Sequence, residues 1–201
     1  FEKTPVVVKS VVTSDLSKKI AEKFGAEVIE VLTGFKYIGQ VALELEKDEQ
    51  REFAFGYEES YGYLISDFVR DKDAIQIVPA IVKLASVLKN EDSTLVDYLN
   101  DIYKEFSRRM EKMISHKFEG IEGKEKISEI MDQFRGNTPT EIEGRKVICV
   151  EDFQNRERRL SSGEVETIEL PKADVIKIHF EDGWIALRPS GTEPKIKLYV
   201  S

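Results

Sequence analysis

Residues 188–194 bring together the groups that bind a phosphate ester. Arg188 offers a fixed guanidinium charge, which forms paired, charge-assisted hydrogen bonds to phosphate oxygens. Ser190 and Thr192 add hydroxyl donors, and Gly191 lets backbone N–H groups approach an anion because it has no Cβ. This combination predicts recognition of a phosphate dianion. The alternative is an ordinary turn with one surface arginine, since proline and glycine are typical of turns.

The first half of the chain alternates short apolar runs with amphipathic stretches. This alternation predicts a parallel sheet with helices on both faces, built from right-handed crossovers. The expected helix at about 72–88 is apolar most of the way round, so we expect it to be largely buried, with Pro79 inside it. The other expected elements are strands at 6–12, 28–31 and 53–55, and helices that carry Leu16 to Phe24, Ile38 to Leu45 and Leu95 to Phe106.

The second half reads as several strands joined by turns around one helix. We therefore expect a fold of the α/β class in which a three-layer parallel-sheet domain (1–107) precedes a small antiparallel α+β domain (108–201). The arginine-containing stretch 156–159 is expected to be a solvated loop. Strands are expected at 109–118, 145–150, 175–180, 183–187 and 195–200, with a helix that carries Ile127 to Phe134.

Three polar segments directly follow expected strands of the first domain. They are residues 13–14, 33–36 and 57–62. In parallel sheets, ligands bind beyond the carboxyl ends of the strands, where such segments meet. The topology therefore predicts a ligand site there without reference to any motif.

The segments 33–36, 57–62 and 188–194, in this order and at these separations, resemble those of the α-D-phosphohexomutases. Lys9 and the run 70–73 add to the resemblance. It implies the C-terminal half, domains 3 and 4, of a four-domain bacterial enzyme that interconverts hexose 1-phosphates and 6-phosphates through a bisphosphorylated sugar. The partners implied are a phosphorylated hexose, with glucose favoured over mannose, and the preceding domains of the same polypeptide.

The resemblance also implies roles for individual residues. Glu58 and Ser60 fall on the sugar-recognition loop, where a carboxylate accepts hydrogen bonds from two hydroxyls at once. Glu59 is expected to be structural. The remaining implied contacts are Thr33 and Gly34 on a loop that lines the cleft, Lys9 facing the phosphosugar, and Arg188, Ser190, Gly191 and Thr192 on the phosphate loop.

Lys72 matches a basic position that the resemblance links to electrostatic support or proton transfer. It is the one catalytic candidate of the chain, and the alternative is a lysine that merely begins a helix. The family's phosphoserine and its Asp-rich magnesium loop belong to earlier domains, and the sequence has no Ser-His-Asn-Pro or Asp-x-Asp-x-Asp stretch. We therefore expect magnesium in the full-length enzyme, no metal site in this chain, and little or no mutase activity from the chain alone.

Composition narrows the function classes. The net charge of −8 argues against wholesale nucleic-acid or membrane-surface binding. A single cysteine, Cys149, fits a reducing cytoplasmic compartment, and His116 and His179 are expected to be structural. The chain begins with Phe1 inside an expected element, which suggests a portion of a longer polypeptide. The alternative function is a non-enzymatic phosphate-ester binding module or a protein-interaction module.

Overall fold

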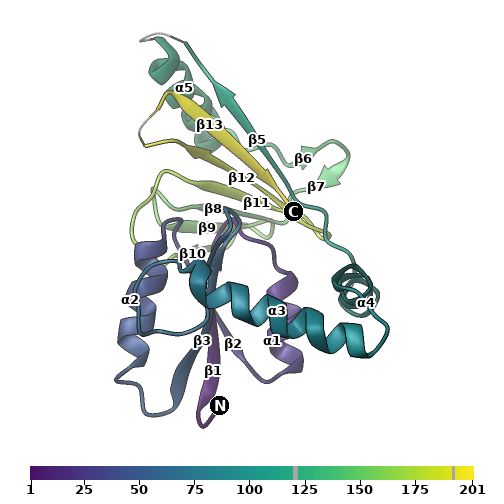
Figure 1. Cartoon of the computed structure of the whole chain (residues 1–201). Coiled ribbons are helices and arrows are strands. Elements are labelled where there is room, and N and C mark those ends of the chain that lie inside the picture. Colours follow the sequence, from purple (N-terminus) through teal and green to yellow (C-terminus); the bar gives the residue numbers. More distant parts are fainter. Residues whose placement is uncertain (120–121, 192) are drawn as a thin grey trace. The chain divides into compact units, whose positions relative to one another are not determined.

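The computed structural model describes residues 1–119, 122–191 and 193–201. The chain folds into two compact units, Phe1–Arg109 and Met110–Ser201, each with its own sheet and core (Figure 1). The units divide after Arg109, and the sequence placed the boundary near residue 107, within a few residues either way.

The first unit is a mixed α/β layer structure. Its sheet has the order β2-β1-β3-β4, in which β1 is parallel to both β2 and β3, and β4 forms an antiparallel edge hairpin with β3. The predicted α/β class is confirmed, with this one antiparallel strand added. The elements are β1 (Thr4–Ser10), α1 (Leu16–Lys23), β2 (Glu27–Val31), α2 (Phe35–Leu45), β3 (Arg51–Glu58), β4 (Gly62–Leu64), α3 (Ala74–Asn90) and α4 (Leu95–Phe106).

Helix α2 covers one face of this sheet and α1 lies on the other side (Figure 1). Val6 and Val8 of β1 pack against Phe35 and Ile38 of α2 in a continuous apolar core. This packing fixes the start of α2 beside the carboxyl ends of the strands, where the sequence predicted the ligand site. The burial of β-branched and aromatic side chains is the main stabilising term.

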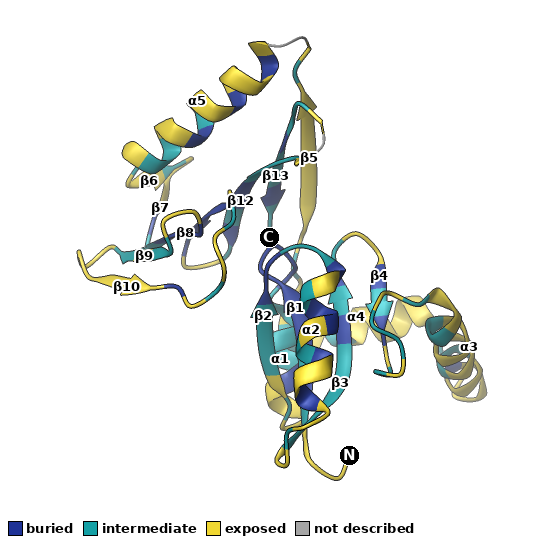
Figure 2. Ribbon diagram, turned by 90° about the vertical axis from the view of Figure 1, so that its left-hand side faces the viewer, coloured by how far each residue is buried: buried dark blue, intermediate teal, exposed yellow. Residues whose placement is uncertain are grey.

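Helix α3 differs from expectation. The sequence predicted a largely buried helix, but within α3 Leu88 alone is buried. Figure 2 shows most of the helix in the colour of exposed residues. Pro79 lies inside the helix as expected, and Asp73 caps its start by accepting a hydrogen bond from the Ile75 N–H.

The second unit is an antiparallel sheet with one helix packed against it, which confirms the predicted α+β class. The sheet has the order β10-β9-β8-β11-β12-β13-β5, and every neighbouring pair in it is antiparallel. Its elements are β5 (Lys112–Lys117), α5 (Glu122–Gly136), β8 (Cys149–Asp152), β9 (Glu157–Leu160), β10 (Val165–Thr167), β11 (Ile176–His179), β12 (Trp184–Pro189) and β13 (Lys195–Val200), with a separate hairpin of β6 (Glu141–Ile142) and β7 (Arg145–Lys146).

The core of the second unit lies between α5 and one face of the sheet. Ile127 and Met131 of α5 are buried against Val150, Ile176 and Ile178. Because side chains alternate along a strand, the neighbouring positions of β12 and β13 face away from α5. The opposite face of the sheet is therefore free to carry polar residues.

Several local expectations were wrong. The arginine-containing stretch 156–159 is not a loop, because Glu157–Leu160 forms β9, and Arg158 pairs with Glu151 and Glu166. The predicted strand at 145–150 is split between β7 and β8. Phe24 lies just after α1 and is exposed, so it does not belong to an apolar helix face.

Candidate functional site

Glu58 is the centre of the candidate site in the first unit. It ends β3 and is buried, and its Oε1 accepts a hydrogen bond from the Gly34 backbone N–H over 2.6 Å. Because Gly34 is the N-cap of α2, this carboxylate lies at the positive end of the helix dipole. The arrangement holds the Glu58 carboxyl group in a fixed position at the carboxyl end of the sheet.

The segment before α2 has an unusual backbone. Gly34 has φ 125° and ψ 122°, a conformation that residues with a Cβ rarely adopt. The neighbouring Thr33 hydroxyl is buried and has no hydrogen-bond partner within the residues that the structure describes. A buried polar group without a partner is rare in folded proteins and is often found where a protein does chemistry or binds a ligand.

Ser60 lies in the tight turn that joins β3 to β4. Glu58 pairs with Gly62 in this hairpin, so three residues form the loop. Tyr61, the third of them, has φ 65° and its side chain is 86% exposed. A left-handed residue at this position is typical of three-residue hairpins, although glycine is the usual choice. The turn therefore presents Ser60 and Tyr61 to solvent beside Glu58.

Glu59 points away from this turn and joins two strand ends. Its Oε2 accepts hydrogen bonds from the hydroxyls of Ser10 and Thr13, both over 3.1 Å, and its backbone N–H donates to the Thr13 hydroxyl. This contact links the end of β3 to the end of β1. Glu59 thus has a structural role, which is what the sequence suggested, and Ser10 is a supporting residue that sequence reasoning missed.

Lys9 lies beneath the site rather than at its surface. Its side chain is fully buried, and Nζ is 2.8 Å from Glu30 and 3.1 Å from Asp15. It also donates to the Thr13 carbonyl over 2.8 Å. In this arrangement Lys9 fixes the segment after β1, and its charge is balanced within the unit.

Lys72 approaches the hairpin from the other side. Its stem passes 3.2 Å from the position that a Cβ at Gly62 would occupy, and Nζ lies 5.8 Å from the centre of the Phe35 ring. The Lys72 side chain is more than half exposed, and its Nζ pairs with Asp71 at 3.1 Å. Hydrogen bonds from the Lys72 side chain and backbone lower the pKa of Asp71. The structure therefore brings an exposed ammonium next to the hairpin that carries Ser60.

The segment that the sequence assigned to phosphate binding lies at the junction of two strands in the second unit. The loop joins β12 to β13, and the Ser190 N–H donates to the Lys195 carbonyl over 2.8 Å. Arg188 is half-buried near the end of β12, with Nη1 3.5 Å from the Tyr199 hydroxyl. Nothing lies within 4 Å of a Cβ built on Gly191, so an anion can reach the backbone there. Thr192, which the sequence also assigned to this loop, lies outside the described residues.

Three lysines near this loop were missed by sequence reasoning. Lys197 is the cross-strand partner of Arg188, and Lys195 is the partner of Lys117 on β5. These positions share one face of the sheet, because paired residues and alternate residues point the same way. A hydrogen bond from Lys195, together with its charge and those of Lys117 and Lys197, lowers the pKa of Glu193. The loop therefore lies in a positive field.

The described side chains form no cluster suited to the magnesium ion that is expected in the full-length enzyme. No group of three or more His, Cys, Asp or Glu side chains in the described part of the chain is arranged to hold a metal ion. His116 lies in β5 against the Phe118 ring, and His179 in β11 is 2.8 Å from Glu151. Both histidines thus take part in local packing or pairing, as expected of structural residues.

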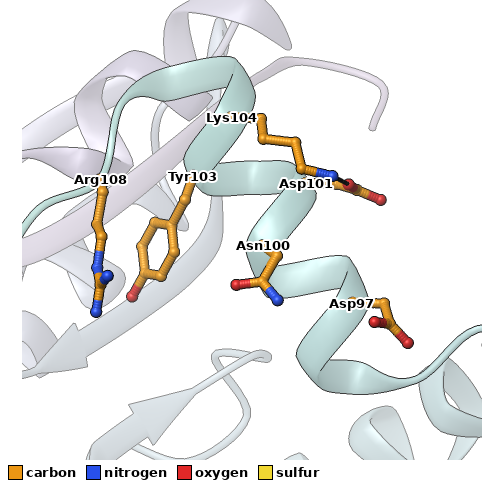
Figure 3. Close-up of a pocket in the computed structure, with 6 residues that line it drawn as sticks. All are labelled: Asp97, Asn100, Asp101, Tyr103, Lys104 and Arg108. Carbon is orange, nitrogen blue, oxygen red and sulfur yellow. Dashed lines mark hydrogen bonds and ion pairs between the residues drawn. The ribbon is translucent and has the colours of Figure 1, made fainter.

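A hollow with a volume of about 400 Å³ lies along α4. Figure 3 shows the residues that line it, which are Asp97, Asn100, Asp101, Tyr103, Lys104 and Arg108. The acidic side chains that line the hollow stabilise α4. Asp97 completes a capping box with Thr94, and Asp101 pairs with Lys104 at 2.7 Å. We therefore do not assign a ligand to it.

Two family models match the chain, and both describe domains of the same family. Residues 1–106 match the family model described as phosphoglucomutase/phosphomannomutase, alpha/beta/alpha domain III. Residues 135–201 match the model of the phosphoglucomutase/phosphomannomutase C-terminal domain. The two matches fall on the two structural units.

Curated relatives are similar over nearly the whole chain. A phosphoglucomutase of Staphylococcus epidermidis is 53% identical over 98% of this chain, which covers 36% of that protein. A phosphoglucomutase of Staphylococcus aureus is 49% identical over 98% of this chain and 35% of that protein. The chain thus spans about a third of the length of the curated relatives that it matches.

Solved structures share the fold. The open form of the Paramecium protein parafusin, a phosphoglucomutase, has a TM-score of 0.66 and 21% identity over 96% of this chain and 32% of that one. A phosphoglucomutase/phosphomannomutase family protein of Burkholderia thailandensis has a TM-score of 0.56 and 11% identity over 99% of this chain and 33% of that one.

Proposed function

The chain belongs to the phosphoglucomutase/phosphomannomutase family, and we propose that it is the substrate-holding portion of a hexose phosphate mutase. The parent enzyme interconverts hexose 1-phosphate and hexose 6-phosphate through a bisphosphorylated sugar, in the cytoplasm, and glucose is the favoured hexose. Within the described residues, no helix has both the length and the apolar character needed to span a membrane.

The sugar is held by the first unit. The carboxylate of Glu58, fixed by the Gly34 N–H, accepts hydrogen bonds from ring hydroxyls, and the exposed Ser60 hydroxyl adds a neutral donor or acceptor. Thr33 and Gly34 form the adjoining wall. The observation that carries this assignment is the 2.6 Å hydrogen bond, because it fixes the geometry of the carboxylate before any ligand binds.

The phosphate group is held by the second unit. Arg188 supplies the paired hydrogen bonds, and the loop of Ser190, Gly191 and Thr192 supplies hydroxyl and backbone donors. Lys117, Lys195 and Lys197 add the positive field. The phosphate held here is the one distant from the reacting centre.

Lys72 and Lys9 have supporting roles. The exposed Lys72 ammonium stabilises negative charge on the phosphosugar or transfers a proton, whereas the buried Lys9 holds the segment after β1 in place. The transferred phosphoryl group and the magnesium ion belong to other parts of the parent enzyme. The isolated chain therefore binds its ligand but does not turn it over.

Calorimetric titration of the isolated chain tests this proposal. We expect glucose 1-phosphate and glucose 6-phosphate to bind more tightly than inorganic phosphate, since only the esters present hydroxyls to Glu58. Glu58→Gln is expected to remove most of this preference and to leave the affinity for inorganic phosphate unchanged. Mannose 1-phosphate, titrated in parallel, reports on the choice of hexose.

Two results count against the proposal. Equal affinity for the esters and for inorganic phosphate, unaffected by Glu58→Gln, favours the non-enzymatic phosphate-binding module. A steady-state mutase rate from the pure isolated chain shows that the chemistry does not depend on the rest of the parent enzyme.

A further inference from the structure

Thr13 is a buried residue after β1 whose hydroxyl holds the end of β3. It is 2% exposed. Its Oγ1 donates a hydrogen bond to Oε2 of Glu59 over 3.1 Å and lies 2.8 Å from the Ser10 hydroxyl. The same oxygen accepts a hydrogen bond from the Glu59 backbone N–H over 3.3 Å. A single hydroxyl therefore fixes both the side chain and the backbone of Glu59.

The backbone of Thr13 is itself held in place. Its N–H donates to the Ser10 carbonyl over 3.0 Å, and its carbonyl accepts a hydrogen bond from Lys9 Nζ over 2.8 Å. Lys9 is fully buried and pairs with Glu30 and Asp15. A threonine side chain also has few rotamers, because two heavy atoms are attached to its Cβ. The hydroxyl is therefore a fixed point next to the end of β3.

Thr13 and Gly34 hold two consecutive residues at the end of β3. Consecutive side chains of a strand point to opposite faces of the sheet, so Glu58 and Glu59 are expected to point in opposite directions. The Gly34 N–H binds the Glu58 carboxyl group, and Thr13 binds Glu59. One contact leaves the strand end free to rotate about that contact, whereas two contacts in opposite directions fix it.

The hydrogen bonds of Thr13 are better suited to fixing a geometry than to adding stability. Val11 and Val12 beside it are buried apolar residues, and a valine has nearly the shape of a threonine. Replacing both partners of a buried hydrogen bond by apolar groups of the same shape is often nearly neutral for stability. The hydroxyl contributes something that a methyl group does not, which is the direction of its hydrogen bonds to Glu59.

We propose that Thr13 is a positioning residue for sugar recognition. It holds the end of β3 so that the Glu58 carboxyl group is in place before a ligand arrives, which lowers the conformational entropy lost on binding. Thr13 does not itself touch the ligand, because it is buried and its hydroxyl is bonded to Glu59. The inference rests on the proposed function, in which Glu58 accepts hydrogen bonds from the hexose.

A double-mutant cycle in the isolated chain tests the proposal. Wild type, Thr13→Val, Glu58→Gln and the double variant are each titrated with glucose 1-phosphate and with inorganic phosphate. Thr13→Val is expected to weaken glucose 1-phosphate binding about fivefold or more in the wild-type background, and less than about twofold in the Glu58→Gln background. The affinity for inorganic phosphate is expected to be the same in every protein, because this ion presents no sugar hydroxyl to Glu58.

Two variants separate positioning from stability. Thr13→Ser keeps the hydroxyl and is expected to bind glucose 1-phosphate within about twofold of wild type. Thr94→Val is the matched control, because it makes the same substitution in the same unit and removes the hydroxyl that accepts the Asp97 N–H over 3.1 Å. Thr94→Val and Thr13→Val are both expected to lower the melting temperature by about 4 °C, but Thr94→Val is expected to leave the affinity unchanged.

A second measurement uses only the wild-type chain, so it does not depend on the folding of any variant. The Glu59 amide donates to Thr13, and its hydrogen exchange is expected to be about tenfold or more slower than in an unstructured peptide. Added glucose 1-phosphate is expected to slow this exchange further, whereas inorganic phosphate is expected to leave it unchanged. An unprotected Glu59 amide overturns the proposal.

The titrations overturn the proposal in any of three cases. In the first, Thr13→Val melts at a lower temperature but binds glucose 1-phosphate like wild type. In the second, the loss is equal in the wild-type and Glu58→Gln backgrounds. In the third, Thr13→Ser loses as much affinity as Thr13→Val.

The same data keep this inference apart from the proposed function. If wild type binds glucose 1-phosphate no better than inorganic phosphate, or if Glu58→Gln has no effect, the proposed function fails and the role of Thr13 fails with it. If wild type prefers the ester and Glu58→Gln removes that preference, but the cycle shows no coupling, the role of Thr13 alone fails.

Discussion

The backbone N–H of Gly34 donates to Oε1 of Glu58 over 2.6 Å, so the segment after β2 fixes the carboxylate that ends β3. The two residues are 24 positions apart in sequence and meet because parallel strands end at the same edge of a sheet. A carboxylate placed at a helix start is also favoured by the helix dipole. The recognition group of the proposed sugar site is therefore held by the backbone, whose geometry depends on glycine.

Gly34→Ala is expected to weaken the binding of glucose 1-phosphate and to destabilise the first unit. A Cβ at this position has room, since its nearest neighbours are 3.8 Å away on Tyr37. The cost therefore comes from the backbone, because φ 125° is nearly closed to alanine, and it amounts to about 1–3 kcal/mol. Urea unfolding measures the stability, and calorimetry measures the affinity.

Gly25→Ala is the control for this prediction. Gly25 also has a positive φ, 66°, and open space around its Cβ position, but it follows α1, away from Glu58. It is expected to lower stability by about 1 kcal/mol and to leave affinity unchanged. Tight ester binding by Gly34→Ala contradicts the role assigned to this hydrogen bond.

Arg188→Lys is expected to lower the affinity for glucose 1-phosphate about tenfold, although the charge is kept. The planar guanidinium makes two parallel hydrogen bonds to a phosphate, and an ammonium group cannot reproduce this geometry. Lys197→Gln, at the cross-strand position on the same face, is the control. The loss of affinity in Lys197→Gln is expected to be smaller and to diminish with added salt, because the Lys197 charge attracts the phosphate only over a distance and salt screens that attraction. Equal losses for both variants at high salt contradict a specific role for Arg188.

Tyr61→Gly is expected to stabilise the isolated chain by about 0.5–1 kcal/mol. The left-handed backbone destabilises the folded state when the residue is a tyrosine, and this cost exceeds the additional backbone entropy that a glycine loses on folding. Tyr61 has φ 65° and a mostly exposed side chain, so little packing is lost. Tyr63→Gly, two residues later in β4, is the control and is expected to destabilise, since Tyr63 stacks on Phe55. Thermal unfolding of the two variants checks both signs, and a loss of stability in Tyr61→Gly contradicts the argument.

The sequence predicted the elements that place the candidate site. Alternation of strands and helices indicated the carboxyl edge of the sheet, and the Thr33-Gly34 and Glu58 segments do meet there. This prediction succeeded because it depends on local periodicity and on a general rule of parallel sheets. The same reasoning placed the loop of residues 188–194 between two strands, which the structure confirms.

Other features depend on register and on neighbours, which local patterns do not contain. Lys117 lies near the proposed phosphate loop only because β5 pairs with β13. Its cross-strand partner Lys195 is 78 residues later in the sequence. The local sequence around Arg158 is typical of a loop, and the residue is part of a strand because β9 pairs with β8, where Arg158 lies opposite Glu151. Helix α3 was predicted to be buried because it is apolar around most of its circumference. Such a pattern does not identify which part of a protein packs against the helix.

The ion pair of Glu151 with His179 predicts a loss of stability in acid. Burial alone raises the pKa of Glu151, but the hydrogen bond and charge of His179, with Arg158 and Lys177, outweigh it and lower the pKa to about 2. The folded pKa lies below the unfolded value of 4.5, so the unfolded chain binds more protons between these values. The stabilisation is therefore complete above about pH 4.5 and is lost as the pH falls towards 2.

Glu151→Gln isolates this contribution, which is on the order of 2–3 kcal/mol. The variant is expected to be less stable than wild type at about pH 6. It is also expected to lose less stability than wild type between about pH 5 and about pH 3, a range that spans the titration of Glu151. Urea unfolding at several pH values measures the difference. Glu166→Gln, which removes a more exposed partner of Arg158, is the control and is expected to leave the acid dependence nearly unchanged. Parallel pH profiles for wild type and Glu151→Gln contradict the assignment.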